Sequence, residues 1–279
     1  MKNRLAILLL VILCSLSAAA QYNNLEFVEN KGQWNSKVQY MGDMNNGAFF
    51  LRKTGYTILQ HRSEDLKRLG SLMHKDGPTS QHHNSAGKHA DPEKEPAGGG
   101  ASDNNNYLLR SHAYEMEFEG ANASTRLTGD KPLNTVNNYF LGNDSTKWAA
   151  ECKLYQGVTY ENLYPNIDAK YFTVDGVLKY EFIVKPGGNP SDILMHFKGT
   201  NGLKLKNNEL IIKTSVGDIT ELAPYTYQFV GNEKKVVDCR YVLNGNKVSF
   251  KLKQYDPSVT LVIDPSLIFA TFTLSLIHI

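Results

Sequence analysis

Two acidic residues, Asp168 and Glu181, are the best candidates in this sequence for acid–base chemistry. A glycoside hydrolase needs two carboxyl groups about 5–10 Å apart, one as the acid and the other as nucleophile or base. Asp168 and Glu181 flank a predicted hairpin turn at Asp175-Gly176, so they are expected to share one sheet. Alternating strands also place charged residues on the solvent-exposed face, and the sequence leaves both interpretations open.

Aromatic residues form the second group of candidates. The chain contains 15 Tyr, 12 Phe and 2 Trp, and exposed rings on a β surface can stack on sugars. Four of them cluster along the sequence and form a candidate ligand-binding platform: Trp148, Tyr155, Tyr160 and Tyr164. Packing of the same rings between sheets is the alternative interpretation.

Histidines gather in the polar segment 62–106, where His74, His82, His83 and His89 lie. Histidine-rich tracts can bind Zn²⁺ or Ni²⁺, but a catalytic metal site needs ligands on rigid elements. We therefore expect a solvated linker, with no metal site and no cofactor. The sequence also lacks a Gly-x-Ser-x-Gly elbow, a phosphate-binding Gly-rich loop and a His-Glu-x-x-His motif. It identifies no catalytic residue.

The first 20 residues have the pattern of a secretory signal peptide. Lys2 and Arg4 precede an apolar stretch at 5–13, and small residues end at Ala20. This stretch is too short to span a membrane, and we expect no membrane span once it is removed. Cys14 suggests a lipoprotein as the alternative, but the small residues after it form a better cleavage region. We predict an exported protein, located outside the cell, on its surface or in the periplasm.

Removal of residues 1–20 leaves 28 basic and 28 acidic residues, because Lys2 and Arg4 account for the net charge of +2. A neutral chain is not typical of proteins that bind nucleic acid. Cys152 and Cys239 are then the remaining cysteines. In an oxidising compartment they are able to form one disulfide, and the alternative is two separately buried thiols.

Strand patterns occupy most of the mature chain. Residues 21–61 and 107–265 contain short apolar runs separated by Asn and Gly turns, and Tyr114, Met116 and Phe118 alternate on one face. Residues 62–106 lack such runs and are expected to be a disordered insertion, with one or two helical turns near its start. We predict an all-β, antiparallel, sandwich-like fold with two lobes.

Five segments, taken together, resemble a known family: residues 27–34, 138–144, 164–168, 178–182 and 261–265. The chain is similar to the β-rich N-terminal domain of secreted Bacteroidetes-type surface proteins, which precedes SBBP β-propeller repeats. The resemblance implies a non-catalytic structural or interaction domain of a larger surface or secreted protein, with the downstream repeats as its partner. It transfers no catalytic residue to this chain.

Two other classes of function stay open, a carbohydrate-binding module and a glycoside hydrolase. Surface glycans and other surface proteins are accordingly further expected partners. Residues 266–279 are interpreted as the start of the downstream region. Within them, the apolar and charge-free residues 274–279 are interpreted as the non-native end of a truncated reading frame.

Overall fold

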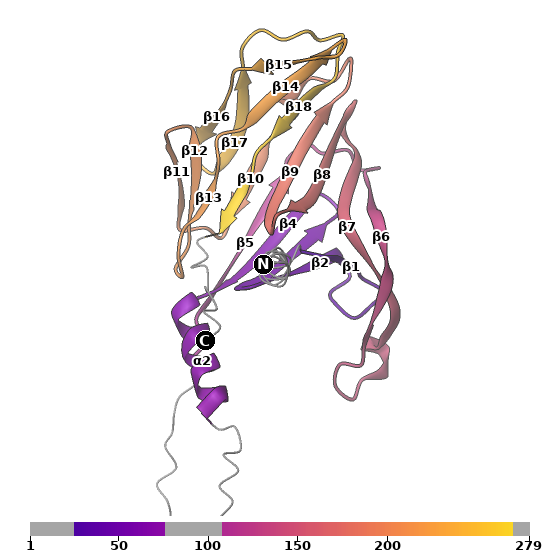
Figure 1. Cartoon of the computed structure of the whole chain (residues 1–279), viewed down its shortest axis with the longest axis vertical. Coiled ribbons are helices and arrows are strands. Elements are labelled where there is room, and N and C mark those ends of the chain that lie inside the picture. Colours follow the sequence, from indigo (N-terminus) through magenta and orange to yellow (C-terminus); the bar gives the residue numbers. More distant parts are fainter. Residues whose placement is uncertain (1–24, 76–107, 270–279) are drawn as a thin grey trace, which may run out of the picture.

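The computed structural model describes residues 25–75 and 108–269 (Figure 1). The predicted signal peptide, most of the polar segment and the last ten residues lie outside the described residues. Strands make up most of the described chain, together with one α-helix, α2 (Ser63–Lys75), and two short 3₁₀ helices, η1 (Ser145–Lys147) and η2 (Pro190–Asp192).

The larger sheet has 15 strands, and its order along the main path is β15-β14-β18-β9-β8-β7-β1-β2-β3-β4-β5-β10-β17-β16, with β6 paired to β7. Its strands are β1 (Phe27–Glu29), β2 (Val38–Met44), β3 (Gly47–Arg52), β4 (Gly55–His61), β5 (Ser111–Phe118), β6 (Arg126–Tyr139), β7 (Ala149–Tyr164), β8 (Ile167–Val174), β9 (Val177–Val184), β10 (Met195–Lys198), β14 (Tyr225–Val230), β15 (Glu233–Val237), β16 (Cys239–Asn244), β17 (Lys247–Leu252) and β18 (Leu261–Asp264).

This sheet is antiparallel and nearly closed on itself. Its two terminal strands, β15 and β16, are consecutive in the chain and are separated by Asp238 alone. The sheet must therefore curl round until its ends meet, which gives it an inner face and an outer face. The prediction of an all-β antiparallel fold with an insertion is confirmed.

A second sheet of four strands has the order β11-β12-β13-β19. Its strands are β11 (Gly202–Lys206), β12 (Glu209–Lys213), β13 (Ile219–Glu221) and β19 (Leu267–Phe269). The side chains of Leu210, Ile212, Ile219 and Leu267 are buried in the same core as the large sheet. Residues 267–269 thus form a strand of this fold, although the sequence placed them in the downstream region.

The predicted hairpin at Asp175-Gly176 is present between β8 and β9. Both residues have positive φ, +50° and +75°, as the favoured two-residue hairpin turn requires. Asn207 and Asn208 join β11 to β12 in the same way, with φ of +53° and +62°. Local turn chemistry therefore fixes the register of both hairpins.

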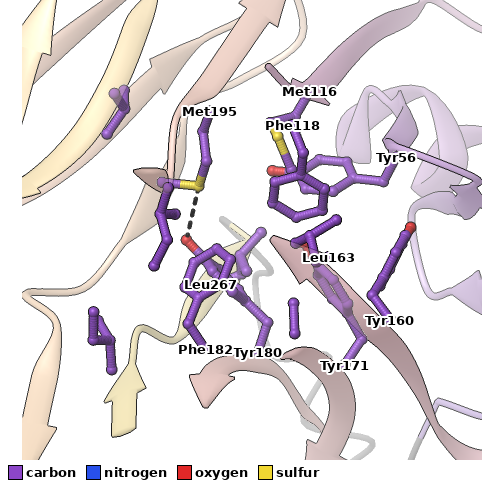
Figure 2. Close-up of a cluster of buried hydrophobic side chains, with 14 of the residues drawn as sticks. Tyr56, Met116, Phe118, Tyr160, Leu163, Tyr171, Tyr180, Phe182, Met195 and Leu267 are labelled. Atoms are coloured by element: carbon purple, nitrogen blue, oxygen red, sulfur yellow. Dashed lines mark hydrogen bonds between the residues drawn. The ribbon is translucent and has the colours of Figure 1, made fainter. Parts of the chain in front are cut away.

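The core is rich in tyrosine (Figure 2). The predicted face of Tyr114, Met116 and Phe118 is buried, which confirms the alternation in β5. Rings from β4, β7, β8 and β9 meet it on the inner face of the sheet, and all of them are buried: Tyr56, Tyr160, Tyr171, Tyr180 and Phe182. The inner face is consequently the main hydrophobic core of the protein.

Helix α2 has 13 residues, which is longer than the one or two turns expected at this place. Its first turn is fixed to the chain just before β5. The guanidinium of Arg110 donates to Asp65 Oδ1 at 2.6 Å and to Oδ2 at 2.8 Å. These hydrogen bonds hold the pKa of the buried Asp65 carboxyl well below its usual range.

Candidate functional site

Strands β6 and β7 form a long hairpin that extends beyond the rest of the sheet at the lower right of Figure 1. We call the part formed by residues 133–153 the arm. Strand β7 pairs with β8 from Gly157 onward and with β1 at Leu154 and Tyr155. Among the described strands, its residues before Leu154 pair with β6 alone. The arm is therefore supported by side chains at its base.

The base of the arm has a hydrophobic cluster of its own. Its buried members are Val28, Ala149, Cys152 and Leu154, and the partly buried Trp34, Leu133 and Tyr139 pack against them. The rings of Trp34 and Tyr139 meet edge to face at 5.1 Å. This packing joins the arm to β1 and to the loop after it.

The loop after β1 is fixed by the side chain of Asn30. Its Nδ2 donates to the carbonyl oxygens of Asn35 at 3.0 Å and Val38 at 2.8 Å, and its Oδ1 accepts from Gly32 N at 3.0 Å. Gly32 has φ of +113°, a conformation that favours glycine. Lys31 of this loop reaches the arm, where its Nζ donates to the carbonyl oxygen of Glu151 at 2.8 Å. The loop thus holds the arm in place.

The tip of the arm exposes large apolar side chains. Phe140 is 66% exposed, Leu141 47% and Trp148 47%. The rings of Phe140 and Trp148 meet edge to face at 5.6 Å, and Trp148 Nε1 donates to the carbonyl oxygen of Gly142 at 3.1 Å. An ordered group of exposed apolar side chains is typical of a contact surface.

The four residues of the predicted aromatic platform do not come together. Tyr160 and Tyr164 are buried in the main core, where Tyr160 Oη donates to the carbonyl oxygen of Gly55 at 2.7 Å. Tyr155 is half-buried and packs edge to face on Tyr40 at 5.7 Å. Trp148 alone of the four is well exposed, at the tip of the arm. Their positions in the chain place them on different faces and at different ends of the hairpin.

Cys152 and Cys239 are free thiols, and both are buried. Cys152 lies in the cluster at the base of the arm, whereas Cys239 lies in β16 and belongs to the main core. Burial raises the pKa of both thiols. The structure thus holds two separate thiols, the alternative to the disulfide that the sequence left open.

Asp168 and Glu181 lie on the outer face of the large sheet, and Glu181 lines a pocket there that does not include Asp168. Asp168 Oδ1 accepts from Asn162 N at 2.8 Å, and its Oδ2 lies 2.6 Å from Lys185 Nζ. Glu181 stands opposite Lys170 and lines a pocket of about 290 Å³. Asp168 is thus occupied by partners of its own.

The carboxylate that acts on Glu181 belongs instead to Asp264 of β18. Burial and the charge of Asp264 raise the pKa of Glu181, and burial raises the pKa of Asp264. Asp264 was not among the residues predicted for this site, although its polar side chain in the apolar segment 261–265 was the available signal. These two carboxylates, rather than Asp168 and Glu181, form the acidic pair of this face.

Neither a metal cluster nor a membrane-spanning helix is found in residues 25–75 and 108–269. No three His, Cys, Asp or Glu side chains in these ranges are grouped so as to hold a metal ion. None of the helices described there combines the length and apolar character needed to cross a bilayer. His74 lies in the last turn of α2, and His82, His83 and His89 lie outside the described residues.

These features define an antiparallel β domain with a nearly closed sheet, a tyrosine-rich core and a braced hairpin arm. The chain belongs to the family described as Domain of unknown function (DUF7948), which matches residues 27–266. The match includes the strands on both sides of the polar segment. No curated protein and no solved structure matches the chain.

Proposed function

We propose that this domain is a non-catalytic interaction module of a larger exported protein, and that the tip of its arm binds a protein partner. The exposure of Phe140, Leu141 and Trp148 on a braced hairpin carries this proposal. Large aromatic side chains that become buried on association contribute most of the binding energy in many interfaces. Because the arm is held at its base, little ordering is required when its tip binds.

The partner we propose is the region downstream of the domain, the β-propeller repeats implied by the family resemblance. The position of β19 supports this choice. Leu267 is 1% exposed, and β19 pairs with β13 over Leu267–Phe269. A chain that leaves the domain from a packed strand starts at a fixed position. The domain is thereby able to act as a scaffold for the downstream repeats.

The experiment compares the mature chain with the triple variant Phe140→Ser, Leu141→Ser, Trp148→Ser. Binding to the separately purified downstream region is measured by isothermal titration calorimetry. We expect the triple variant to bind at least about tenfold more weakly, because three apolar contacts are lost. The midpoint of thermal unfolding should barely change, since these side chains are exposed.

Leu108→Ser is the matched control, because Leu108 is 56% exposed and lies outside the arm. It should leave both binding and unfolding unchanged. Equal affinity of the triple variant and the unmodified chain for the downstream region would show that the tip of the arm is not the binding site. No binding of the unmodified chain to the downstream region would remove the proposed partner.

A further inference from the structure

In a half-buried strand, aromatic residues are expected to point inward and polar residues outward. Strand β14 shows the reverse arrangement. Thr226 and Gln228 point inward and are 1% and 3% exposed, whereas Tyr225 and Phe229 are 45% and 53% exposed. The amide of Gln228 is satisfied there, with Nε2 donating to the carbonyl oxygens of Asp256 at 2.7 Å and Val259 at 3.0 Å. The outward rings therefore have no role in the core.

The outward side chains of β14 form a row of three adjacent rings, Tyr225, Tyr227 and Phe229, which we call the outer ladder. The ring centroids are 5.6 Å apart between Tyr225 and Tyr227, and 5.7 Å apart between Tyr227 and Phe229. The exposed Lys234 of β15 places its Nζ 3.8 Å from the centroid of Tyr227. The spacing of the rings is close to the length of one sugar unit in an extended chain.

Two carboxylates lie beside the outer ladder. Asp264 is opposite Tyr225 in the pairing of β14 with β18. The pairing of Ile263 with Phe182 brings Asp264 next to Glu181 on β9. Asp264 Oδ1 is a buried acceptor without a donor among the described residues, and Asp264 Oδ2 lies 3.8 Å from Lys179 Nζ. A ligand therefore reaches Asp264 outside the buried Oδ1, on a side chain that is 20% exposed.

A polar pocket adjoins Glu181 on the side away from the outer ladder. Asp130, Gln156, Lys170 and Glu181 provide charged and amide groups to its lining, and its volume is about 290 Å³. Strands β8, β9, β18 and β14 are neighbours in this order, as their labels show in Figure 1. The pocket, the two carboxylates and the outer ladder consequently form one strip across the outer face.

We propose that this strip binds a neutral carbohydrate chain. The rings of the outer ladder stack on the C–H faces of the sugars, Glu181 and Asp264 accept hydrogen bonds from hydroxyl groups, and the pocket holds one further sugar unit. A sugar chain combines apolar faces with hydroxyl donors, and the strip offers a partner for each. The site is separate from the arm, and the inference does not depend on the function proposed for the arm.

The charges of the strip favour a neutral sugar over the other ligand classes. The core of a protein–protein interface is depleted of charged residues, whereas here the rings and the exposed Val236 are bordered by Lys234, Glu181 and Asp264. Lys170 lies 3.3 Å from Asp130 and Lys179 lies 3.8 Å from Asp264, so the strip offers little uncompensated charge to an anionic polymer such as a polyuronate or a nucleic acid. A small number of placed polar groups beside aromatic rings is the usual composition of a small-ligand site.

Lys234 provides a test of the proposed stacking. Its ammonium group covers the face of Tyr227 and lies 4.7 Å from the centroid of Tyr225. A sugar that stacks on these rings must displace it, and the side chain is exposed and long enough to move. Lys234→Ala should therefore strengthen binding of a neutral chain. A ligand with negative charge would instead lose a partner and bind more weakly.

The experiment uses the mature chain with four soluble polysaccharides: galactomannan, xyloglucan, mixed-linkage β-glucan and polygalacturonate. Affinity electrophoresis and calorimetry measure binding to each. We expect at least one neutral polysaccharide to bind and polygalacturonate to bind more weakly or not at all. Tyr227→Ala should weaken binding about tenfold, the paired variant Glu181→Gln, Asp264→Asn severalfold, and Tyr227→Phe little, because the ring is kept.

Each other outcome overturns the proposal in a defined way. Absence of binding to all three neutral polysaccharides would show that carbohydrate is not the ligand class. Preference for polygalacturonate would show that the carbohydrate ligand is not neutral. Unchanged binding in Tyr227→Ala rejects the site, and loss of sugar binding in the arm variant places the sugar on the arm. Leu108→Ser again serves as the control, and thermal unfolding shows that each variant is folded. Because the arm and the strip are changed separately, the two proposals fail independently.

Discussion

The inner and outer faces of the large sheet both carry tyrosine and phenylalanine side chains, but these side chains have different roles on the two faces. On the inner face, Tyr171 and Tyr180 are fully buried and stacked, with centroids 5.3 Å apart. On the outer face, Tyr225 and Phe229 are about half exposed beside charged residues. The inner rings stabilise the fold, and the outer rings are available to a ligand. Residue type alone therefore says little about the role of a tyrosine in this protein.

The inner face also holds a carboxyl group that joins the two sheets. Glu221 of β13 is fully buried, and its Oε2 accepts from the hydroxyl groups of Tyr180 at 2.9 Å and Tyr241 at 3.4 Å. Burial raises the pKa of Glu221 to about 7, against the opposing effect of these hydrogen bonds. The outer pair Glu181 and Asp264 lies instead beside lysines, so the acidic groups differ between the faces as the rings do.

The largest effect should come from removing an inner ring. Tyr171→Ala should lower the free energy of unfolding by about 3–5 kcal/mol, because a large buried side chain leaves a cavity. Tyr171→Phe should change it little, since the hydroxyl group is buried without a hydrogen-bond partner in the described chain. Urea unfolding followed by circular dichroism measures both. A loss below about 1 kcal/mol for Tyr171→Ala would show that the inner face tolerates cavities. The proposed difference in stabilising role between inner and outer rings would then be wrong.

The second effect concerns pH and Glu221. The pKa of this group is about 7 in the folded protein and near 4.5 in the unfolded chain. Between these pH values the folded state binds more protons than the unfolded chain. The contribution of Glu221 to the free energy of unfolding is therefore largest below pH 4.5 and falls as the pH rises to 7. The expected loss is about 3 kcal/mol, complete above about pH 7.

Glu221→Gln separates this contribution from those of the other acids. The raised pKa values of Glu181 and Asp264 act in the same direction, so the unmodified chain alone does not isolate Glu221. Urea unfolding at a series of pH values from about 5 to 8 should give a flatter profile for the variant. Parallel profiles of the two proteins would mean that Glu221 is not the group that titrates.

Local features of the fold could be predicted from the sequence, because they depend on neighbouring residues. The Asp175-Gly176 turn and the alternation of Tyr114 and Met116 are examples, since turn conformation and a period of two residues determine them. Alternation does not tell which face of a strand is buried. The sequence of β14 has the same period whether Tyr227 or Gln228 points inward. The inward Gln228 is stabilised by hydrogen bonds to a distant loop, which the sequence does not reveal.

The candidate sites were harder to predict, because distant strands build them. Trp148 was predicted as part of a ligand-binding platform and is exposed, but Tyr160 and Tyr164 of the same predicted platform are core residues. Glu181 was identified without Asp264, since 83 positions separate the two in the chain and only the pairing of β9 with β18 brings them together. Proximity in sequence is a poor guide to a site on a sheet of this size.

The smallest effect should come from the outer ladder, and it tests the comparison most directly. Phe229→Ser should change the free energy of unfolding by no more than about 0.5 kcal/mol, because the ring is 53% exposed. Phe182→Ser removes the same ring from a site with 0% exposure and should cost several times as much. Urea unfolding of the two variants under the same conditions gives the ratio. A loss of about 2 kcal/mol or more for Phe229→Ser would show that the outer ring contributes to the fold. The outer ladder would then be an extension of the core, and its exposure would no longer argue for a ligand.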